Sequence, residues 1–184
     1  TQVLSSSIRL SFIFALPLIL FSCNPTQKLL KSDNVEEKFN AAERYFNKAE
    51  YQKALPFLED LLNVYRGTAK SEKVYYYYAY TEYKIADLTI ASYYFQMLYT
   101  TFPFSQYAEE SMFLSAYCQY LQSPGEELDQ EYSHKAIDAF QLFVNKYPDS
   151  KHADDCNKYM DELTYKIERK DINNALLYYK IEDY

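Results

Sequence analysis

The sequence predicts an all-α fold, a superhelix of antiparallel helix pairs. Only 2 of the 184 residues are glycine, so tight turns should be few and most of the chain should lie in helices joined by short loops. A pattern of small and bulky residues recurs three times along the chain, and in two of the three copies a proline follows it. Because proline ends a helix, each copy reads as one helix pair that stacks on the next.

The first residues read as a targeting segment. Arg9 precedes residues 10–21, which are almost entirely hydrophobic. This run is too short for a membrane span and suits the core of a signal peptide. It ends in residues 20–23 (LFSC), which resemble a lipobox, so we expect residues 1–22 to be a lipoprotein signal peptide and Cys23 to be lipidated. An ordinary secretory signal with an incidental cysteine is the alternative.

Cys23 is then the first residue of the mature protein, and residues 23–34 form a lipidated tether. Asn24 follows the cysteine. In lipoproteins of this kind an Asp at that place implies retention in the inner membrane, so Asn24 resembles sorting to the outer membrane. No acidic cluster that resembles a surface-export signal follows. We therefore expect the periplasmic face.

Three units in residues 35–149 share one spacing. Each has a small alanine in its first helix, a second alanine in the next helix, and bulky residues four and seven positions later. The first unit, about residues 35–67, has Ala42, Ala54, Leu58 and Leu61, with Arg66 where a proline is expected. The second, about 70–104, has Ala79, Ala91, Phe95, Leu98 and Pro103. The third, about 106–149, has Ala116, Ala136, Phe140, Phe143 and Pro148.

The spacing has a physical reason. Two helices approach closely only where small side chains meet, and the bulky residues fill the groove toward the next unit. The set resembles tetratricopeptide repeats. In the third unit, residues 123–130 lengthen the turn between the two helices. Pro56 is expected in the first turn of its helix, where its missing N–H costs little.

Residues 152–184 are expected to form further helices. Asp149 and Ser150 read as an N-cap region for a long helix across about 152–168, and another helix should follow from about 170. Residues 179–183 (YKIED) echo residues 83–87 (YKIAD), which makes Ala175 the counterpart of Ala79. Because no partner helix follows that unit, we expect the superhelix to be truncated at its C-terminal end.

The first helix of each pair carries a row of aromatic residues. Positions three before, one after and four after the small alanine lie within about 60° of one another around a helix. Across the three units these positions hold Phe39, Glu43, Phe46, Tyr76, Tyr80, Tyr83, Phe113, Tyr117 and Tyr120. Buried tyrosine hydroxyls are difficult to satisfy, so we expect a peptide-binding groove, with Lys73 and Lys84 as partners for a carboxylate. The alternative is that these rings belong to the core.

Composition and motifs argue against several other functions. The net charge of −7 and the lack of a basic run argue against nucleic acid. No catalytic set occurs at a recognisable spacing, and two glycines cannot build a phosphate loop, so we expect neither an enzyme nor a cofactor. Cys118 and Cys156 stand alone in sequence, so we expect buried thiols and no metal site. A disulfide between them is the alternative.

A narrower resemblance is carried by residues 42–46 (AERYF), 51–55 (YQKAL), 135–140 (KAIDAF) and 147–155 (YPDSKHADD). With the lipobox and the interrupted third unit, these segments are similar to the BamD family, the lipoproteins of the outer-membrane β-barrel assembly machine. The resemblance covers about residues 20–184. The abundance of tyrosine looks like a member from Bacteroidetes.

The resemblance implies a non-enzymatic, lipid-anchored scaffold of the outer-membrane protein assembly (BAM) complex. It implies docking on the barrel protein BamA and binding of terminal segments of unfolded outer-membrane proteins, which usually end in an aromatic residue. Two alternatives remain open. One is another periplasmic tetratricopeptide lipoprotein that acts as a scaffold, and the other is a sugar-binding lipoprotein whose aromatic residues stack on sugar rings.

Overall fold

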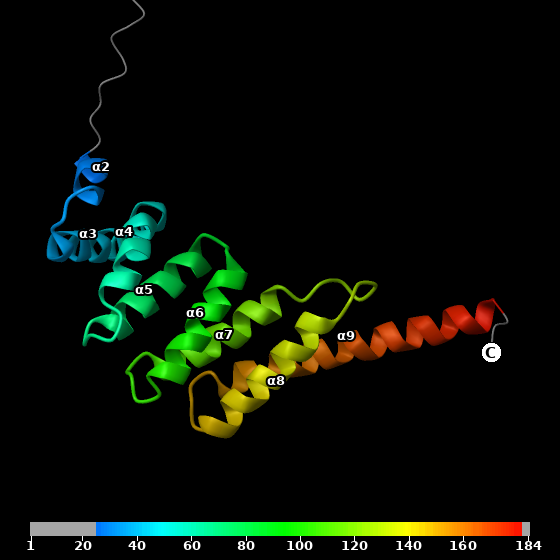
Figure 1. The fold of residues 1–184 in the computed structure, drawn as a ribbon. Helices are drawn as coiled ribbons and strands as arrows, with labels where there is room; N and C mark the ends of the chain where they lie inside the picture. The colour runs from blue at the N-terminus through cyan, green and yellow to red at the C-terminus, as the bar shows by residue number, and fades with distance from the viewer. Residues whose placement is uncertain (1–24, 182–184) are drawn as a thin grey trace, which may run out of the picture. The chain divides into compact units, whose positions relative to one another are not determined.

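The computed structural model describes residues 25–181, and every regular element in that part is an α-helix (Figure 1). The all-α prediction is therefore confirmed. Cys23 and the expected signal peptide lie outside the described residues. The helices are α2 (Pro25–Leu30), α3 (Val35–Asn47), α4 (Tyr51–Val64), α5 (Ser71–Lys84), α6 (Leu88–Thr101), α7 (Ala108–Leu121), α8 (Glu131–Lys146) and α9 (Ala153–Lys180).

The chain divides into two units, and the division falls between Asn34 and Val35. In the first unit, part of the expected tether forms the short helix α2. It begins with Pro25, whose fixed φ and missing N–H suit the first position of a helix. No helix in residues 25–181 has the length and apolar character needed to span a membrane.

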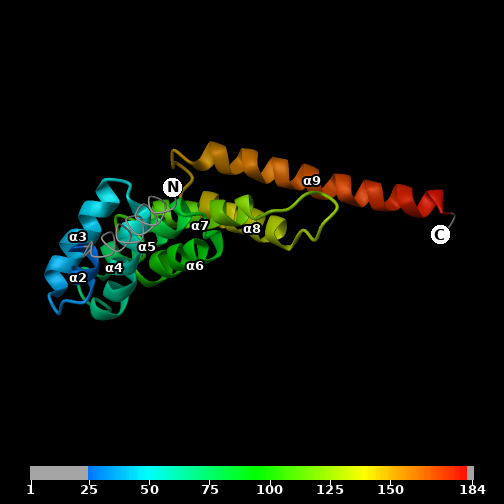
Figure 2. The same cartoon turned by 90° about the horizontal axis from the view of Figure 1, so that it is seen from above.

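The second unit is a series of stacked helix pairs. Each helix from α3 to α9 packs mainly against its neighbours along the chain, and α3 also contacts α5. Figure 2 shows the same succession from above. The pairs α3/α4, α5/α6 and α7/α8 fall in the residue ranges of the three repeated units. This arrangement is the stack of helix pairs that the repeated spacing predicts.

The repeated small and bulky residues form the core. The six alanines of the pattern are at most 1 % exposed, and the six bulky residues at the next two positions are completely buried. Burying each such Leu or Phe side chain stabilises the fold by roughly 1.5–3 kcal/mol. The bulky residues are Leu58, Leu61, Phe95, Leu98, Phe140 and Phe143.

Tight turns occur despite the shortage of glycine. Ala49 and Ala86 have φ values of 57° and 69°, in the left-handed region. They close equivalent turns, in which the N–H of Glu50 donates to Tyr45 (2.9 Å) and that of Asp87 to Glu82 (3.0 Å). An alanine in this conformation costs roughly 1–2 kcal/mol relative to the right-handed region. A low glycine count therefore did not exclude left-handed turns.

Two expectations about helix ends are wrong. Helix α4 begins at Tyr51, so Pro56 lies in its second turn and not in its first. There the missing N–H removes the bond that the Gln52 carbonyl would accept. At the other end, one continuous helix, α9, replaces the two helices expected across 152–168 and from about 170. Neither proline nor glycine interrupts it, so nothing in its sequence breaks the helix.

The two halves of α9 have different surroundings. Its first half packs against α8 and buries Ala153, Cys156 and Leu163. From Asp171 to the end of the helix every residue is exposed. The exposed part includes Ile172, Leu176, Leu177 and Tyr178.

The insertion between α7 and α8 is held by α9. Lys166 of α9 donates to the hydroxyl of Ser123 and to the carbonyl of Pro124, the latter at 2.9 Å. Arg169 pairs with Glu126 at 3.0 Å. Lys170 donates to the carbonyl of Leu128 at 2.5 Å. Three cationic side chains of α9, Lys166 and, one turn later, Arg169 and Lys170, therefore hold the insertion.

Candidate peptide-binding surface

The predicted aromatic positions separate into two groups by burial. Phe39, Tyr76 and Phe113, three residues before the small alanines, are 6 %, 9 % and 8 % exposed and belong to the core. The aromatic positions after the alanines are half-buried. The latter are Phe46, Tyr80, Tyr83, Tyr117 and Tyr120, which we call the aromatic row. The three positions before the alanines are therefore core positions, and the five residues of the row lie partly at the surface.

The rings of the aromatic row contact one another from α3 to α7. The ring centroids of Phe46 and Tyr80 are 5.5 Å apart, and those of Tyr80 and Tyr83 are 6.0 Å apart. Tyr83 reaches Tyr117 of the next pair at 6.5 Å, and Tyr117 stacks with Tyr120 at 5.7 Å. Such edge and stacked contacts between rings are favourable beyond their area burial. The row is thus a continuous, rigid surface that crosses two junctions between pairs.

Several aromatic residues that support the row were not predicted. Tyr77 stacks on Phe46 at 4.0 Å, and Tyr159 of α9 approaches Tyr120 at 4.5 Å. Behind the row, Tyr107 stacks on Tyr76 at 4.4 Å and His152 on Phe113 at 4.0 Å. The spacing of Ala153, Cys156, Tyr159 and Leu163 along α9 marks one helix face and could have identified Tyr159. Nothing in the repeat spacing identifies Tyr77.

Lys73 already has a carboxylate partner within the chain. Its Nζ lies 2.5 Å from Oε1 of Glu43, and this hydrogen bond raises the pKa of Lys73. Its charge is thus already balanced by a carboxylate of the chain itself. Lys84 is exposed, and its Nζ lies 5.1 Å from the ring centroids of Tyr80 and Tyr83. Within residues 25–181 Lys84 forms no ion pair.

Tyr83 and Tyr120 of the row have raised pKa values and are protonated at neutral pH. Burial raises the pKa of Tyr83, and a hydrogen bond to Glu162 raises the pKa of Tyr120 to about 12. The Tyr120 hydroxyl donates to Oε2 of Glu162 at 2.6 Å. These two residues therefore offer apolar ring faces together with neutral hydroxyl groups.

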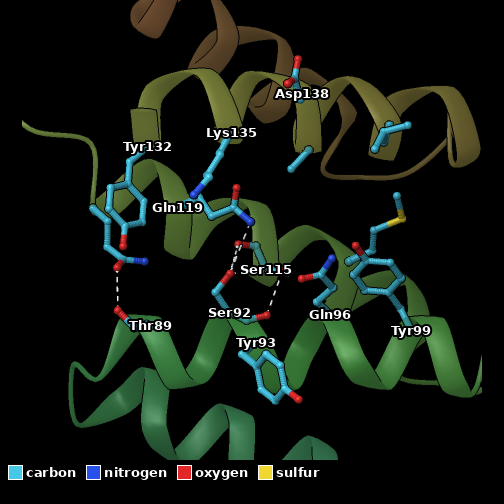
Figure 3. A pocket seen from close by; sticks show the side chains of 14 residues that line it. Thr89, Ser92, Tyr93, Gln96, Tyr99, Ser115, Gln119, Tyr132, Lys135 and Asp138 are labelled. Carbon is cyan, nitrogen blue, oxygen red and sulfur yellow. Dashed lines mark hydrogen bonds between the residues drawn. The ribbon is translucent and has the colours of Figure 1, made fainter. Parts of the chain in front are cut away.

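Hollows flank the row at both ends. One of about 370 Å³ lies beside Lys84 and Tyr51, and another of about 340 Å³ lies between Tyr120, Glu162 and Lys166. A further pocket of about 450 Å³ lies on the other side of α7, between α6 and α8 (Figure 3). The row is thus a surface with a hollow near each end. The third pocket is separate from the row and lies on the side of α7 that faces α6 and α8.

The two described cysteines are buried free thiols, as expected, and the alternative of a disulfide is wrong. Burial raises the pKa of both Cys118 and Cys156 to about 12, so neither is a thiolate at neutral pH. Among residues 25–181 there is no group of three or more His, Cys, Asp or Glu side chains that could hold a metal ion.

Comparison with models of known protein families gives a match. The model of a family described as YfiO, outer membrane lipoprotein, matches residues 31–184. This range contains all the helices of the second unit. The match specifies a protein family and does not specify Bacteroidetes or any other bacterial group. No curated protein matches the chain.

Proposed function

Because the chain belongs to the YfiO family of outer membrane lipoproteins, we propose that it is a non-enzymatic scaffold of the outer-membrane protein assembly (BAM) complex. Its lipid anchor is Cys23, and it faces the periplasm. It docks on a BamA-like barrel protein and binds the terminal segments of unfolded outer-membrane proteins. The aromatic row is the surface that receives these segments.

The half-buried state of the row carries this proposal. A core residue has no ring face left for a partner, whereas Tyr80, Tyr83, Tyr117 and Tyr120 each keep part of their side chain accessible. Their rings are held by neighbouring rings, so little conformational entropy is lost when a ligand contacts them. Rigid tyrosines of this kind supply large amphipathic contact areas in binding surfaces.

Lys84 defines the direction in which a peptide lies along the row. It lies over the rings of Tyr80 and Tyr83 beside the hollow that Tyr51 also lines. A peptide that ends in an aromatic residue presents a ring and a carboxylate next to each other. Its ring stacks on Tyr80 or Tyr83, and its terminal carboxylate pairs with the Lys84 ammonium. Glu43, paired with Lys73, does not compete for this cation.

The experiment is a calorimetric titration of the full chain with C-terminal peptides of outer-membrane β-barrels. Each peptide is used with a free carboxylate and as its terminal amide. We expect Tyr80→Ala and Tyr117→Ala to weaken binding of both forms by roughly tenfold, because rigid aromatic anchors dominate such contacts. Lys84→Ala weakens binding of the free acid only, since the amide has no charge to pair.

Tyr93→Ala is the matched control, because Tyr93 is 60 % exposed on α6 and lies outside the row. Its affinity should equal that of the unchanged chain. Equal losses in Tyr93→Ala and Tyr80→Ala, or binding of an oligosaccharide in place of the peptides, contradict the proposal. A separate pull-down with the periplasmic part of a BamA-like protein tests the docking.

A further inference from the structure

Helix α5 buries a carboxylate at the junction between the first two helix pairs. Glu82 is 3 % exposed, although glutamate is almost never fully buried unless its charge is paired. Glu59 of α4 and Asp87, the N-cap of α6, both act on it electrostatically. The side chain therefore lies where α4, α5 and α6 meet, and exposure to solvent does not explain its charge.

The other two repeated units have an uncharged residue at this position. The residue three after the small alanine is Tyr45 in the first unit, Glu82 in the second and Gln119 in the third. Tyr45 and Gln119 are half-buried, so Glu82 is the most buried of the three. Tyr45 stacks on Phe57 at 6.0 Å, and Gln119 donates to Oγ of Ser92 at 3.4 Å. The repeat itself therefore requires no charge here.

No cation in the described part of the chain forms an ion pair with Glu82. Its carboxylate accepts a hydrogen bond from the hydroxyl of Tyr78, one turn earlier in α5. Tyr94 faces it from α6 with a neutral hydroxyl. The charged groups that face it, Glu59 and Asp87, are carboxylates and disfavour a further negative charge.

Among these three carboxylates, Glu82 should be the first to take up a proton as the pH falls. Glu59 and Asp87 are exposed, and Asp87 also accepts a hydrogen bond from the N–H of Ile90 at 3.1 Å. Burial raises the pKa of Glu82, and the hydrogen bond from Tyr78 opposes this rise in part. Asp87 and Glu59 add to the rise.

We propose that Glu82 makes the packing of α4, α5 and α6 dependent on pH. In mildly acidic solution its side chain is a neutral carboxyl, and the three helices pack without a buried charge. As the pH rises the side chain ionises, and the junction then contains a charge with two carboxylate neighbours. The junction is therefore most stable in mildly acidic solution. This proposal does not rest on the function proposed for the aromatic row.

The direction of the effect follows from proton binding. The pKa of Glu82 is raised in the folded state above its ordinary value of 4.5, which applies to the unfolded chain. Between these two values the folded state binds more protons, so the free energy of unfolding rises as the pH falls. Above the folded pKa both states are ionised, and below the unfolded pKa both are protonated, so the effect is confined to this window.

The test is urea unfolding of the full chain and of Glu82→Gln at steps from about pH 8 to about pH 4.5. Glutamine keeps the size of the side chain and is the residue at the equivalent position of α7. As the pH falls, the unchanged chain should gain stability relative to the variant, by at most about tenfold in the unfolding equilibrium constant per pH unit. His152, whose pKa is lowered by burial, gives the opposite slope in both proteins and cancels in the difference.

The matched control is Glu59→Gln, which removes an exposed carboxylate that acts on the same junction. Its stability should depend on pH almost as strongly as that of the unchanged chain, because Glu82 still takes up the proton. Equal slopes in Glu82→Gln and the unchanged chain, or a slope that is lost only in Glu59→Gln, overturn the proposal.

A second measurement does not require Glu82→Gln to fold. In the full chain with 13C-labelled glutamate side-chain carboxyl groups, one NMR signal should titrate at higher pH than the others. Tyr78→Phe should raise the midpoint of this signal further, because the lost hydrogen bond favoured the charged form of Glu82. Glutamate signals that all titrate together, or a high midpoint that Tyr78→Phe does not change, overturn the assignment to Glu82.

Discussion

Helix α5 and the second half of α9 carry related sequences in different surroundings. Ala79 is completely buried at the crossing of α5 with its neighbours, whereas its counterpart Ala175 is exposed. Tyr76 is 9 % exposed, whereas its counterpart Ile172 is 58 % exposed. Helices α4 and α6 cover α5 on both sides, while no helix in residues 25–181 covers the second half of α9.

The comparison separates two requirements that the repeat pattern combines. The spacing of small and apolar residues makes a helix able to be buried, but burial also needs a neighbour on each side. Helix α5 has both the spacing and a neighbouring helix on each side, so its tyrosines stabilise the fold. In the second half of α9 the apolar positions are on the surface, and they contribute helix propensity and little packing.

The largest difference is expected for truncation of equivalent side chains. Tyr76→Ala should lower the free energy of unfolding by about 3 kcal/mol, because it empties a packed site and removes the ring on which Tyr107 stacks. Ile172→Ala should change it by about 0.5 kcal/mol or less. Urea unfolding followed by circular dichroism measures both. Similar losses at the two positions show that the end of α9 is covered in solution.

Enlarging the equivalent alanines should give the next largest difference. Ala79→Leu inserts three carbon atoms at a helix crossing that is completely buried, and overpacking of this kind costs about 2 kcal/mol. Ala175→Leu places the same side chain in solvent and should leave the melting temperature unchanged. Differential scanning calorimetry distinguishes these outcomes. A stable Ala79→Leu variant contradicts the packing assigned to this crossing.

Raising the pH into the alkaline range should lower the free energy of unfolding, because of the buried tyrosines. Burial raises the pKa of Tyr76, Tyr78 and Tyr83 in the folded state, whereas in the unfolded chain these groups lose their protons near pH 10. Above that pH the unfolded state binds fewer protons than the folded state, so the free energy of unfolding falls as pH rises. Below about pH 9 this contribution is fully present.

Urea titrations between about pH 9 and about pH 11 measure this slope. The slope should be smaller in Tyr76→Ala, which lacks one of the raised groups. An unchanged slope in that variant contradicts the assignment of the pH effect to the α5 tyrosines.

The smallest effect is expected at the link between the aromatic row and α9. Tyr120→Phe removes the 2.6 Å hydrogen bond to Glu162 and keeps the ring. Because both partners are partly exposed, the loss should be about 0.5 kcal/mol. A double-mutant cycle with Glu162→Gln measures the coupling. Coupling of zero shows that ring contacts alone attach the row to Tyr159.

The repeated alanines and bulky residues predicted the helix pairs and their core, because those positions must be small or apolar wherever they occur. The continuity of α9 was not predicted, since the echo of residues 83–87 near its end suggested a new helix. Helix breaks depend on local residues, and no such residue occurs between Ala153 and Lys180.

The candidate surface was predicted only in part. The offsets from the small alanine identified the aromatic residues of α5 and α7 but could not separate the core position Tyr76 from the half-buried Tyr80. Burial of a ring depends on the next helix pair, which is distant in sequence. The pairing of Lys73 with Glu43 and the contribution of Tyr159 were missed for the same reason.

The bonds between the insertion and α9 have a consequence for the order of unfolding. Pro124 and Glu126 precede α8, whereas Lys166 and Arg169 follow it, so these contacts close a loop of the chain that contains α8. Helix α8 is therefore held in the stack by its own packing and, in addition, by these contacts. We therefore expect the amides of α8 to exchange more slowly than they would without the bonds of the insertion, and the third helix pair to persist longer under unfolding conditions.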